Sequence, residues 1–387
     1  MNKQTVIIGS GHMMDAIYRK PGEPPRFPGE LHDAVAQAVR KELENYPRPI
    51  LISSGACGVD IIFQEEVKRL GGKRFMVLPY HVADFRKTCL QGYQGKNWNA
   101  RFDHIREGVS KEIILNAECP NDNAVVSEFC NRYMVGYARR IAFEHGADVQ
   151  LISLWNGLPG KAIGGTASML AYCREHGIPD KVLPVFQPQI KRTKGFPIAS
   201  KTLDAIPKPK ELKQNIVAVL FADAVKFSRL SDHQLQNFIG HFLKPVSQLI
   251  AHHREDILVR NSWGDGLFVV FKSVAGAANF ARVLGEYITH KRFKDVGLPS
   301  GFSIRIALHA GPVFAYPDPI LKRENFLGSH INQAVRLEPV IRPGRVYCSD
   351  AFYTLCMAEC PESFRFKPKG EITLAKNFGR HPAFELC

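Results

Sequence analysis

The sequence has no run of about 18 apolar residues, the length that a membrane-spanning helix requires. Its first residues, Met1 to Gln4, lead directly into a strand-like segment and show no signal-peptide pattern. The nine cysteines have no repeated spacing and include no C-x-x-C pair, so neither a disulfide framework nor a zinc site is expected. The sequence therefore predicts a soluble, cytoplasmic protein with no membrane partner.

Internal repeats and low-complexity tracts are also absent from the 387 residues. The formal net charge of +14 favours a polyanionic partner, which could be a nucleic acid or a phosphate-rich small molecule. The basic residues are spread widely, and no DNA- or RNA-binding signature accompanies them. A nucleic-acid partner is therefore not expected. The length of 387 residues is typical of a protein with two or three domains.

Residues 1–185 alternate short apolar runs with helical patterns such as Leu31 to Tyr46 and Ile61 to Leu70. The expected strands are Thr5 to Gly9, Pro49 to Ser53, Phe75 to Pro79, Glu112 to Asn116, Val149 to Leu154 and Val182 to Val185. This alternation of strands and helices predicts an α/β, Rossmann-like domain with a doubly wound parallel sheet. Residues 186–213 are rich in proline and lysine and are interpreted as a linker.

Residues 214–387 mix strands and helices without strict alternation, which predicts an α+β layer fold. A strand at Ile216 to Ala222 precedes an amphipathic helix from Leu235 to Ile250, with a kink expected at Pro245. The segments expected after it are a hairpin around Asp265, a helix at Val274 to His290, a strand at Ser303 to His309, a helix at Ile331 to Leu337 and terminal strands through Leu386.

Two carboxylates stand at strand ends in this second domain. Asp265 lies between two glycines directly before the apolar run Leu267 to Phe271, which predicts the tip of a β-hairpin. Asp223 follows the strand that ends at Ala222. Two carboxylates on adjoining strand ends can share hard divalent cations such as Mg²⁺ or Mn²⁺.

Nitrogen-bearing side chains follow later in the chain. Asn332 and Arg336 are four residues apart and so lie on one helix face, where an amide and a guanidinium can hold a sugar oxygen and a phosphate. Lys376, in the stretch L-A-K-N-F-G, adds a compact cation near the C-terminus. Together with the two carboxylates, these groups describe a site for a metal-bound nucleoside triphosphate.

The motif F-x-D-x-x-x-F-S at Phe221, the W-G-D hairpin, the G-x-x-x-N-x-x-x-R helix and the late lysine occur in this order. Through them, residues 214–387 resemble a class III nucleotidyl cyclase catalytic domain, which has an α+β ferredoxin-like fold. The resemblance implies two divalent cations per site, held by Asp223, Asp265 and the backbone carbonyl of Ala224. It also implies conversion of a nucleoside triphosphate into a 3′,5′-cyclic nucleotide and pyrophosphate.

The same resemblance assigns the ribose to Asn332, the charge on the α-phosphate to Arg336 and the terminal phosphates to Lys376. In the family, the carboxylates come from one subunit and these three residues from the other. Because this chain carries both sets in a single cyclase domain, the implied active form is a homodimer with two equivalent sites.

Base selection is the least defined property. Where family adenylate cyclases carry Lys and Asp (or Thr), and guanylate cyclases Glu and Cys, this chain has Asn261 and Asn325. Trp263 shares a strand face with Asn261 and would either narrow the base pocket or pack in the core. Altered pockets of this kind resemble the pyrimidine cyclases of the Pycsar antiphage system, which make cyclic UMP or cyclic CMP. We expect that activity, with adenylate cyclisation as the alternative.

Glycine-rich turns in the first domain precede helices, where backbone N–H groups can bind phosphate. The turns contain Gly9, Ser10, Gly55, Gly164, Gly165 and Thr166. They resemble the SLOG family of Rossmann-like nucleotide-binding domains, without the P-G-G-x-G-T-x-x-E element of its phosphoribohydrolases. The resemblance implies a sensor for a nucleotide-like ligand that gates the cyclase, and a purely structural or dimerising domain is the alternative.

Two alternatives to a catalytic domain are a nucleic-acid-binding protein, which only the net charge supports, and a degenerate cyclase domain. A degenerate cyclase domain could act as a nucleotide-binding signalling module, although such domains usually lose a metal-binding Asp or the Arg. A cyclic nucleotide product implies a downstream receptor, which the sequence does not name. Neither the activating signal nor a general base is identified by any motif.

Overall fold

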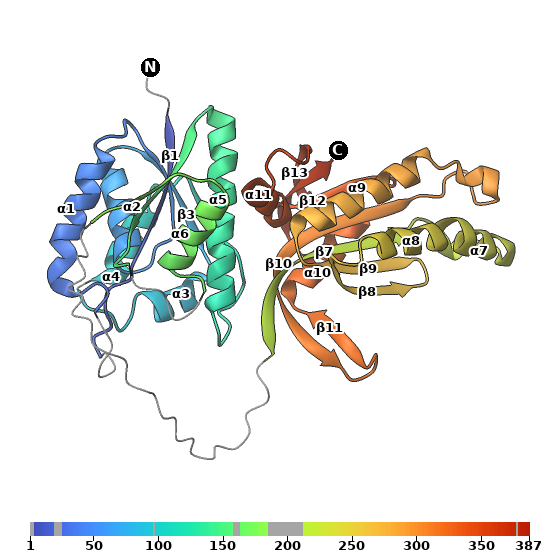
Figure 1. Cartoon of the computed structure of the whole chain (residues 1–387), viewed down its shortest axis with the longest axis horizontal. Coiled ribbons are helices and arrows are strands. Elements are labelled where there is room, and N and C mark those ends of the chain that lie inside the picture. Colours follow the sequence, from blue (N-terminus) through green and yellow to red (C-terminus); the bar gives the residue numbers. More distant parts are fainter. Residues whose placement is uncertain (1–3, 19–24, 96, 158–162, 185–211, 377) are drawn as a thin grey trace, which may run out of the picture. The chain divides into compact units, whose positions relative to one another are not determined.

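The computed structural model describes residues 4–18, 25–95, 97–157, 163–184, 212–376 and 378–387. The chain divides into two compact units, one ending at Leu212 and the other beginning at Lys213 (Figure 1). The expected linker, residues 186–213, falls almost wholly outside the described residues. No helix in the described ranges is both long and apolar enough to cross a membrane.

The N-terminal unit is built on a parallel sheet of six strands in the order β4-β3-β2-β1-β5-β6. The strands are β1 (Thr5–Gly11), β2 (Ile50–Ser53), β3 (Lys73–Leu78), β4 (Lys111–Ile114), β5 (Asp148–Leu154) and β6 (Asp180–Val182). The strand order reverses beside β1, since β2 and β5 lie on its two sides. Ligands bind at such a switch point in open α/β sheets.

Six α-helices connect these strands in the described part of the unit. They are α1 (His32–Leu43), α2 (Val59–Arg69), α3 (Val82–Cys89), α4 (Trp98–Arg106), α5 (Ala124–His145) and α6 (Thr166–Glu175). Helices α1, α2 and α4 pack together, as do α5 and α6. The predicted parallel sheet with connecting helices is therefore present.

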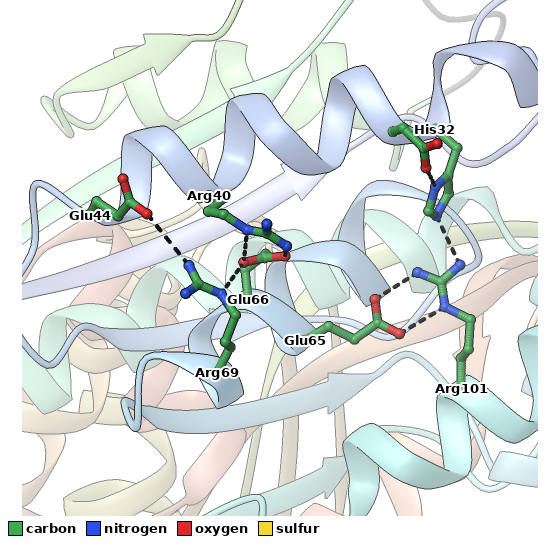
Figure 2. Close-up of polar contacts among 8 residues, drawn as sticks. His32, Arg40, Glu44, Glu65, Glu66, Arg69 and Arg101 are labelled. Carbon is green, nitrogen blue, oxygen red and sulfur yellow. Dashed lines mark hydrogen bonds and ion pairs between the residues drawn. The ribbon is translucent and has the colours of Figure 1, made fainter.

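Charged side chains connect α1, α2 and α4 (Figure 2). Glu66 of α2 accepts two hydrogen bonds from the Arg40 guanidinium of α1, at 3.0 and 2.9 Å. Its neighbour Glu65 accepts two from Arg101 of α4, at 2.7 and 2.6 Å, and Arg101 also reaches His32 of α1. Because bidentate pairs fix direction as well as distance, they set how these helices lie against one another.

The C-terminal unit contains an eight-stranded sheet, with seven strands in the order β13-β14-β12-β10-β7-β9-β8 and β11 paired to β10. The strands are β7 (Lys213–Ala224), β8 (Ile257–Trp263), β9 (Gly266–Phe271), β10 (Ile304–Asp318), β11 (Arg323–Leu327), β12 (Val346–Ser349), β13 (Phe366–Thr373) and β14 (Arg380–Leu386). Its helices are α7 (Asp232–Phe238), α8 (Lys244–His252), α9 (Val274–His290), α10 (Ser329–Leu337) and α11 (Asp350–Glu359). The order β10-β7-β9-β8, connected as β-α-β-β-α-β, is a ferredoxin-like core.

The kink expected at Pro245 takes the form of a π-helical turn, Ile239–Leu243, between α7 and α8. Proline has no N–H for the carbonyl four residues earlier, which belongs to His241. That carbonyl instead accepts the Tyr287 hydroxyl of α9 at 2.5 Å. The π-helical turn is thus joined to α9 by this hydrogen bond.

The expected strands all differ from those in the structure by one residue or more in their bounds, and two of these differences have a specific physical reason. The strand expected at Val182 to Val185 is β6, which ends at Val182, and Pro184 cannot donate the next ladder bond. The strand expected to end at His309 continues to Asp318, through Gly311 and Pro312. Pro312 is tolerated because it lies between the stretch of β10 that pairs with β12 and the stretch that pairs with β11.

A buried histidine pair joins β10 to α10. His309 Nε2 lies 2.8 Å from His330 Nδ1, and His309 Nδ1 lies 2.7 Å from Ser349 Oγ. A Cβ at Gly311 would come within 2.2 Å of His330 Nδ1, so only glycine leaves room for this ring. Burial lowers the pKa of His309 well below its ordinary value and that of His330 to about 4.

We predict that the C-terminal unit loses stability as pH falls from 7 toward 5. The unfolded histidines, with a pKa near ~6.5, would take up protons that the folded pair excludes, at up to about 2.7 kcal/mol per pH unit for two groups. Calorimetry of the full chain at pH 7, 6 and 5 measures the slope. His330→Gln should reduce it, whereas the exposed control His233→Gln should not; equal slopes in all three proteins would contradict the prediction.

Candidate active site

The two predicted metal-binding carboxylates converge at one edge of the ferredoxin-like sheet. Asp223 lies opposite Gly266 in the β7–β9 pairing, and Asp265 directly precedes Gly266. The β8–β9 hairpin turns at Gly264, whose φ of 61° is in the left-handed region, so the expected hairpin tip is confirmed. Ala224, the expected carbonyl ligand, is the last residue of β7.

The electrostatics of Asp223 reflect this proximity. Burial and then the neighbouring Asp265 carboxylate raise the pKa of Asp223, and a hydrogen bond from Arg305 opposes both. Arg305 Nη2 donates to Asp223 Oδ2 at 3.1 Å. Two carboxylates this close repel each other unless a proton or a cation intervenes.

A third carboxylate, which sequence reasoning missed, lies beside the pair. Arg305 Nε is 2.7 Å from Glu338 Oε1, at the end of α10, and Glu338 is only 4% exposed. Burial, which Arg305 opposes and the charges of Asp223 and Asp265 reinforce, raises the pKa of Glu338 to about 7. Arg305 could have been suspected from its register opposite Asp223, but a single sequence does not reveal that register.

Three carboxylates around one guanidinium leave an excess of negative charge, which suits a hard divalent cation with oxygen ligands. Among the described residues, no three His, Cys, Asp or Glu side chains converge closely enough to hold a metal by themselves. Asp223 and Asp265 would therefore hold such ions together with backbone, water and phosphate oxygens, as Mg²⁺ sites commonly do.

The predicted phosphate- and sugar-binding residues occupy α10 and the loop beside it. His330, Ala334 and Leu337 form the buried face of α10, whereas Asn332 is exposed and Arg336 is half-buried. The Ala375 N–H donates to the Arg336 carbonyl at 3.1 Å, which places the exposed Lys376 next to the end of α10. Asn377 of the same motif lies outside the described residues.

Within the described chain, no hydrogen bond or ion pair joins these three residues to the two carboxylates. The single protomer thus presents two half-sites, one acidic at β7–β9 and one with amide and cationic groups at α10. Glu338 lies next to both, because it directly follows α10 and contacts the arginine that holds Asp223.

The base-recognition residues lie along β8 and β11. Asn261 of β8 is 9% exposed, and its Oδ1 accepts a short hydrogen bond from Arg323 of β11. Asn325, also on β11, donates to Asp318 Oδ2 at 3.0 Å and accepts the Phe326 N–H. Sequence reasoning missed Arg323 and Asp318, since it did not predict β11.

Trp263 does not pack in the core, because 57% of its surface is exposed. Its ring lies 6.3 Å from Phe221 and 6.0 Å from Phe268, measured between centroids. Phe268 is the partner of Asn261 in the β8–β9 register. The expectation that Asn261 and Trp263 share a face therefore agrees with these contacts, and the core-packing alternative is wrong.

In the N-terminal unit, a cavity of about 580 Å³ lies at the switch point of the sheet. The expected residues Ser10, Gly164, Gly165 and Thr166 line it. Gly9 and Gly55 do not, which corrects that part of the expectation. A Cβ at Gly9 would lie 2.9 Å from Leu51 and Phe63, and one at Gly55 would lie 2.7 Å from Phe102, so both glycines permit close packing.

Three helices begin at this cavity, since Asp60, Ala124 and Thr166 near the starts of α2, α5 and α6 line it. Asp60 accepts backbone N–H groups of Ala56 and Gly11, while burial raises its pKa to about 7. Arg26 also lines the cavity. Helix N-termini and an arginine favour an anionic ligand.

Comparison with known proteins shows what the C-terminal unit is similar to. Residues 210–384, which include nearly all of this unit, match the family model of the adenylate and guanylate cyclase catalytic domain. The chain is 24% identical over 172 residues to receptor-type guanylate cyclase gcy-4 of Caenorhabditis elegans, which covers 41% of the chain and 15% of that protein. It is 26% identical over 170 residues to receptor-type guanylate cyclase gcy-19 of Caenorhabditis briggsae, covering 41% and 14%.

Solved cyclase structures also align with the chain. The guanylate cyclase domain of RhGC from Catenaria anguillulae, in complex with GTP, aligns at 22% identity and a TM-score of 0.39 over 45% of the chain and 98% of that domain. The adenylyl cyclase CyaB from P. aeruginosa aligns at 17% identity and a TM-score of 0.41, over 46% and 96%. The chain spans about a seventh of the length of the two receptor-type guanylate cyclases, gcy-4 and gcy-19.

We predict that Arg305→Met destabilises the C-terminal unit by about 2 kcal/mol, because it leaves the Glu338 and Asp223 carboxylates without their shared cation. Arg305 and Asp223 keep about a quarter of their side-chain surface exposed, so solvent screens part of the loss. Calorimetry of the full chain measures the change. Arg305→Lys should recover part of it, and a melting temperature unchanged by Arg305→Met would contradict this account.

Proposed function

We propose that the C-terminal unit converts a nucleoside triphosphate into a 3′,5′-cyclic nucleotide and pyrophosphate. The observation that carries the proposal is the convergence of Asp223 and Asp265 beside the β8–β9 hairpin. The family match over residues 210–384 supports the same reaction class. The favoured substrate is a pyrimidine nucleotide, UTP or CTP, with ATP as the alternative.

The reaction joins the ribose 3′-oxygen to the α-phosphorus and breaks the bond from that phosphorus to the bridging oxygen of the leaving pyrophosphate. The 3′-hydroxyl proton passes to solvent. Divalent cations, when bound at Asp223 and Asp265, supply Lewis-acid stabilisation of phosphate charge. Arg336 and Lys376 would donate hydrogen bonds to the phosphates, and Asn332 would position the ribose.

Because these donors and the carboxylates form separate half-sites, the proposed active form is a homodimer. A signalling role in bacterial antiphage defence, through a downstream cyclic-nucleotide receptor, is supported only by the resemblance to the Pycsar pyrimidine cyclases. The retention of Asp223, Asp265, Asn332, Arg336 and Lys376 argues against a degenerate, non-catalytic module.

We predict cyclic nucleotide formation when the purified chain is incubated with each nucleoside triphosphate and Mn²⁺, with products separated by chromatography and mass spectrometry. Asp265→Asn should lower the rate by about a hundredfold or more, because it removes a charge that holds the cations. Asp232→Asn, a change at the exposed start of α7, is the matched control. No cyclic product from any triphosphate would overturn the proposed function.

Mixing two inactive variants tests the dimer. Asp223→Ala removes the acidic half-site and Arg336→Ala the cationic one, so a mixed dimer has one intact site and one doubly altered site. Random pairing of equal amounts makes half of the dimers mixed, and activity should recover to about a quarter of the unaltered protein's activity. No recovery, although sedimentation shows subunit exchange, would contradict a shared site.

For the N-terminal unit we propose binding of an anionic, nucleotide-like ligand in the 580 Å³ cavity. The helix starts at Asp60, Ala124 and Thr166 and the nearby Arg26 support this chemistry. A merely structural role is the alternative.

We predict that calorimetry of the full chain detects binding of at least one nucleotide from a panel. Ala167→Phe, which fills the cavity, should abolish this binding. Ala167 lines the cavity one residue into α6, whereas Ala171 on the same helix is exposed. Ala171→Phe should therefore leave binding intact. Silence of the whole panel would favour the structural role, and equal binding by both variants would contradict binding in this cavity.

A further inference from the structure

The short turn that follows β7 is fixed on both sides. The Val225 N–H donates to the Ser303 carbonyl at 2.8 Å, just beyond the β7–β10 ladder. Two residues later, the Phe227 ring packs against Phe238 of α7, with centroids 5.0 Å apart. A Cβ at Gly264, where the β8–β9 hairpin turns, would lie 3.7 Å from the same Phe227 ring. The residue between these two anchors therefore has a defined place next to the acidic half-site.

That residue, Lys226, has a strained backbone conformation. Its φ of 64° and ψ of 24° are in the left-handed region, which glycine adopts freely and other residues adopt at a cost. The conformation belongs to the turn, because Lys226 is the N-cap of the 3₁₀ helix Phe227–Arg229 and its carbonyl accepts the Arg229 N–H at 3.0 Å. A glycine would form the same turn with less strain, so the lysine side chain requires a separate explanation.

The folded chain does not supply that explanation. Lys226 is exposed, and within the described residues its ammonium group forms no hydrogen bond or ion pair. Arg229, three residues later, is an exposed cation whose φ is not in the left-handed region. A positive charge for solubility is therefore already present in this turn without the strain that Lys226 adds.

Lysines account for all such strain in the described part of the C-terminal unit. Its residues other than glycine with a left-handed φ are Lys226, Lys322 and Lys376, at 64°, 54° and 58°. Lys376 is the residue expected to bind the terminal phosphates. Lys322 lies in the turn between β10 and β11, where its N–H donates to the Asp318 carbonyl at 2.9 Å. Because backbone strain gathers at functional sites, Lys226 calls for a functional test, and Lys322 offers a matched comparison.

The charge of the acidic half-site indicates what Lys226 could bind. Metal ions held by Asp223 and Asp265 would bring the phosphates of a nucleoside triphosphate to this edge of the sheet. Arg305 is already engaged by Asp223 and by the buried Glu338. Lys226 lies three residues after Asp223, and its flexible four-carbon stem can carry the ammonium group to phosphate oxygens at the same cations. Lysine interacts with phosphate as a point charge, so no fixed geometry is needed.

We propose that Lys226 is a further substrate-binding residue, whose ammonium group donates to the terminal phosphates of the nucleoside triphosphate. It also stabilises the negative charge of the pyrophosphate as that group leaves. The inference rests on the proposed function and adds to it a cation from the acidic half-site, whereas Lys376 belongs to the cationic one. The strain of the turn is the cost of placing this charge beside the phosphates.

The first test uses calorimetry of the full chain with Mg²⁺ and inorganic pyrophosphate or tripolyphosphate, whose binding does not depend on a base. Lys226→Gly should weaken the binding of both by about tenfold, because a charge-assisted hydrogen bond is lost. The loss should shrink in about 1 M salt, which screens exposed charges. Thermal melts should show the opposite effect on stability, a rise of about 2 °C, because the strain is relieved.

Three further variants separate the charge from the backbone. Lys226→Arg keeps the charge and should retain most of the affinity. Lys226→Asn removes the charge but tolerates the left-handed conformation, so it should lose affinity as Lys226→Gly does. Lys322→Gly, the matched control, relieves the same kind of strain in the β10–β11 turn and should raise the melting temperature without changing polyphosphate binding.

Unchanged polyphosphate affinity in both Lys226→Gly and Lys226→Asn would overturn the inference, as would an equal loss in Lys322→Gly or no polyphosphate binding by the unaltered chain. In the cyclisation assay, kcat/KM of Lys226→Gly should fall by about tenfold for the same reason. Absence of any cyclic product, together with polyphosphate binding that depends on Lys226, would instead overturn the proposed function and leave the binding inference standing.

Discussion

The ion-pair network centred on Arg305 connects the parts of the candidate active site. Its guanidinium contacts Asp223 on β7 and Glu338 at the end of α10, and the register of β10 with β7 places it there. Without this cation, the Asp223 carboxylate would face Asp265 and Glu338 with no compensating charge from the protein. The same contact ties the strand that bears the acidic half-site to the helix that bears Asn332 and Arg336.

This arrangement couples two half-sites that a dimer would place in different active sites. Asp223 and Glu338, which directly follows the last turn of α10, share the Arg305 guanidinium. Near its first residue, α10 is also anchored by the His309–His330 contact, for which Gly311 leaves space. The cationic half-site is therefore carried by a helix held at both ends.

Much of the fold could be predicted from the sequence because its periodicities are local. The helix Val274–His290 has the predicted bounds, and the Rossmann-like order of strands and helices follows from the alternating pattern. The errors occur where long-range pairing overrides local signals. Strand β10 continues through Gly311 and Pro312 because β7 pairs with it from Ile304 to Ala315. Strand β11, which carries Arg323, pairs with the last residues of β10.

The sequence by itself determined the residue types of the site and their order along the chain: two carboxylates at strand ends, an amide and an arginine one helical turn apart, and a late lysine. Only the tertiary structure decided that Arg305 and Glu338 join Asp223, that Trp263 is exposed, and that Gly9 and Gly55 permit packing and do not line the cavity. The physical reason is that these properties depend on strand register and on which atoms meet across the core. Neither is encoded in the spacing of residues along the chain.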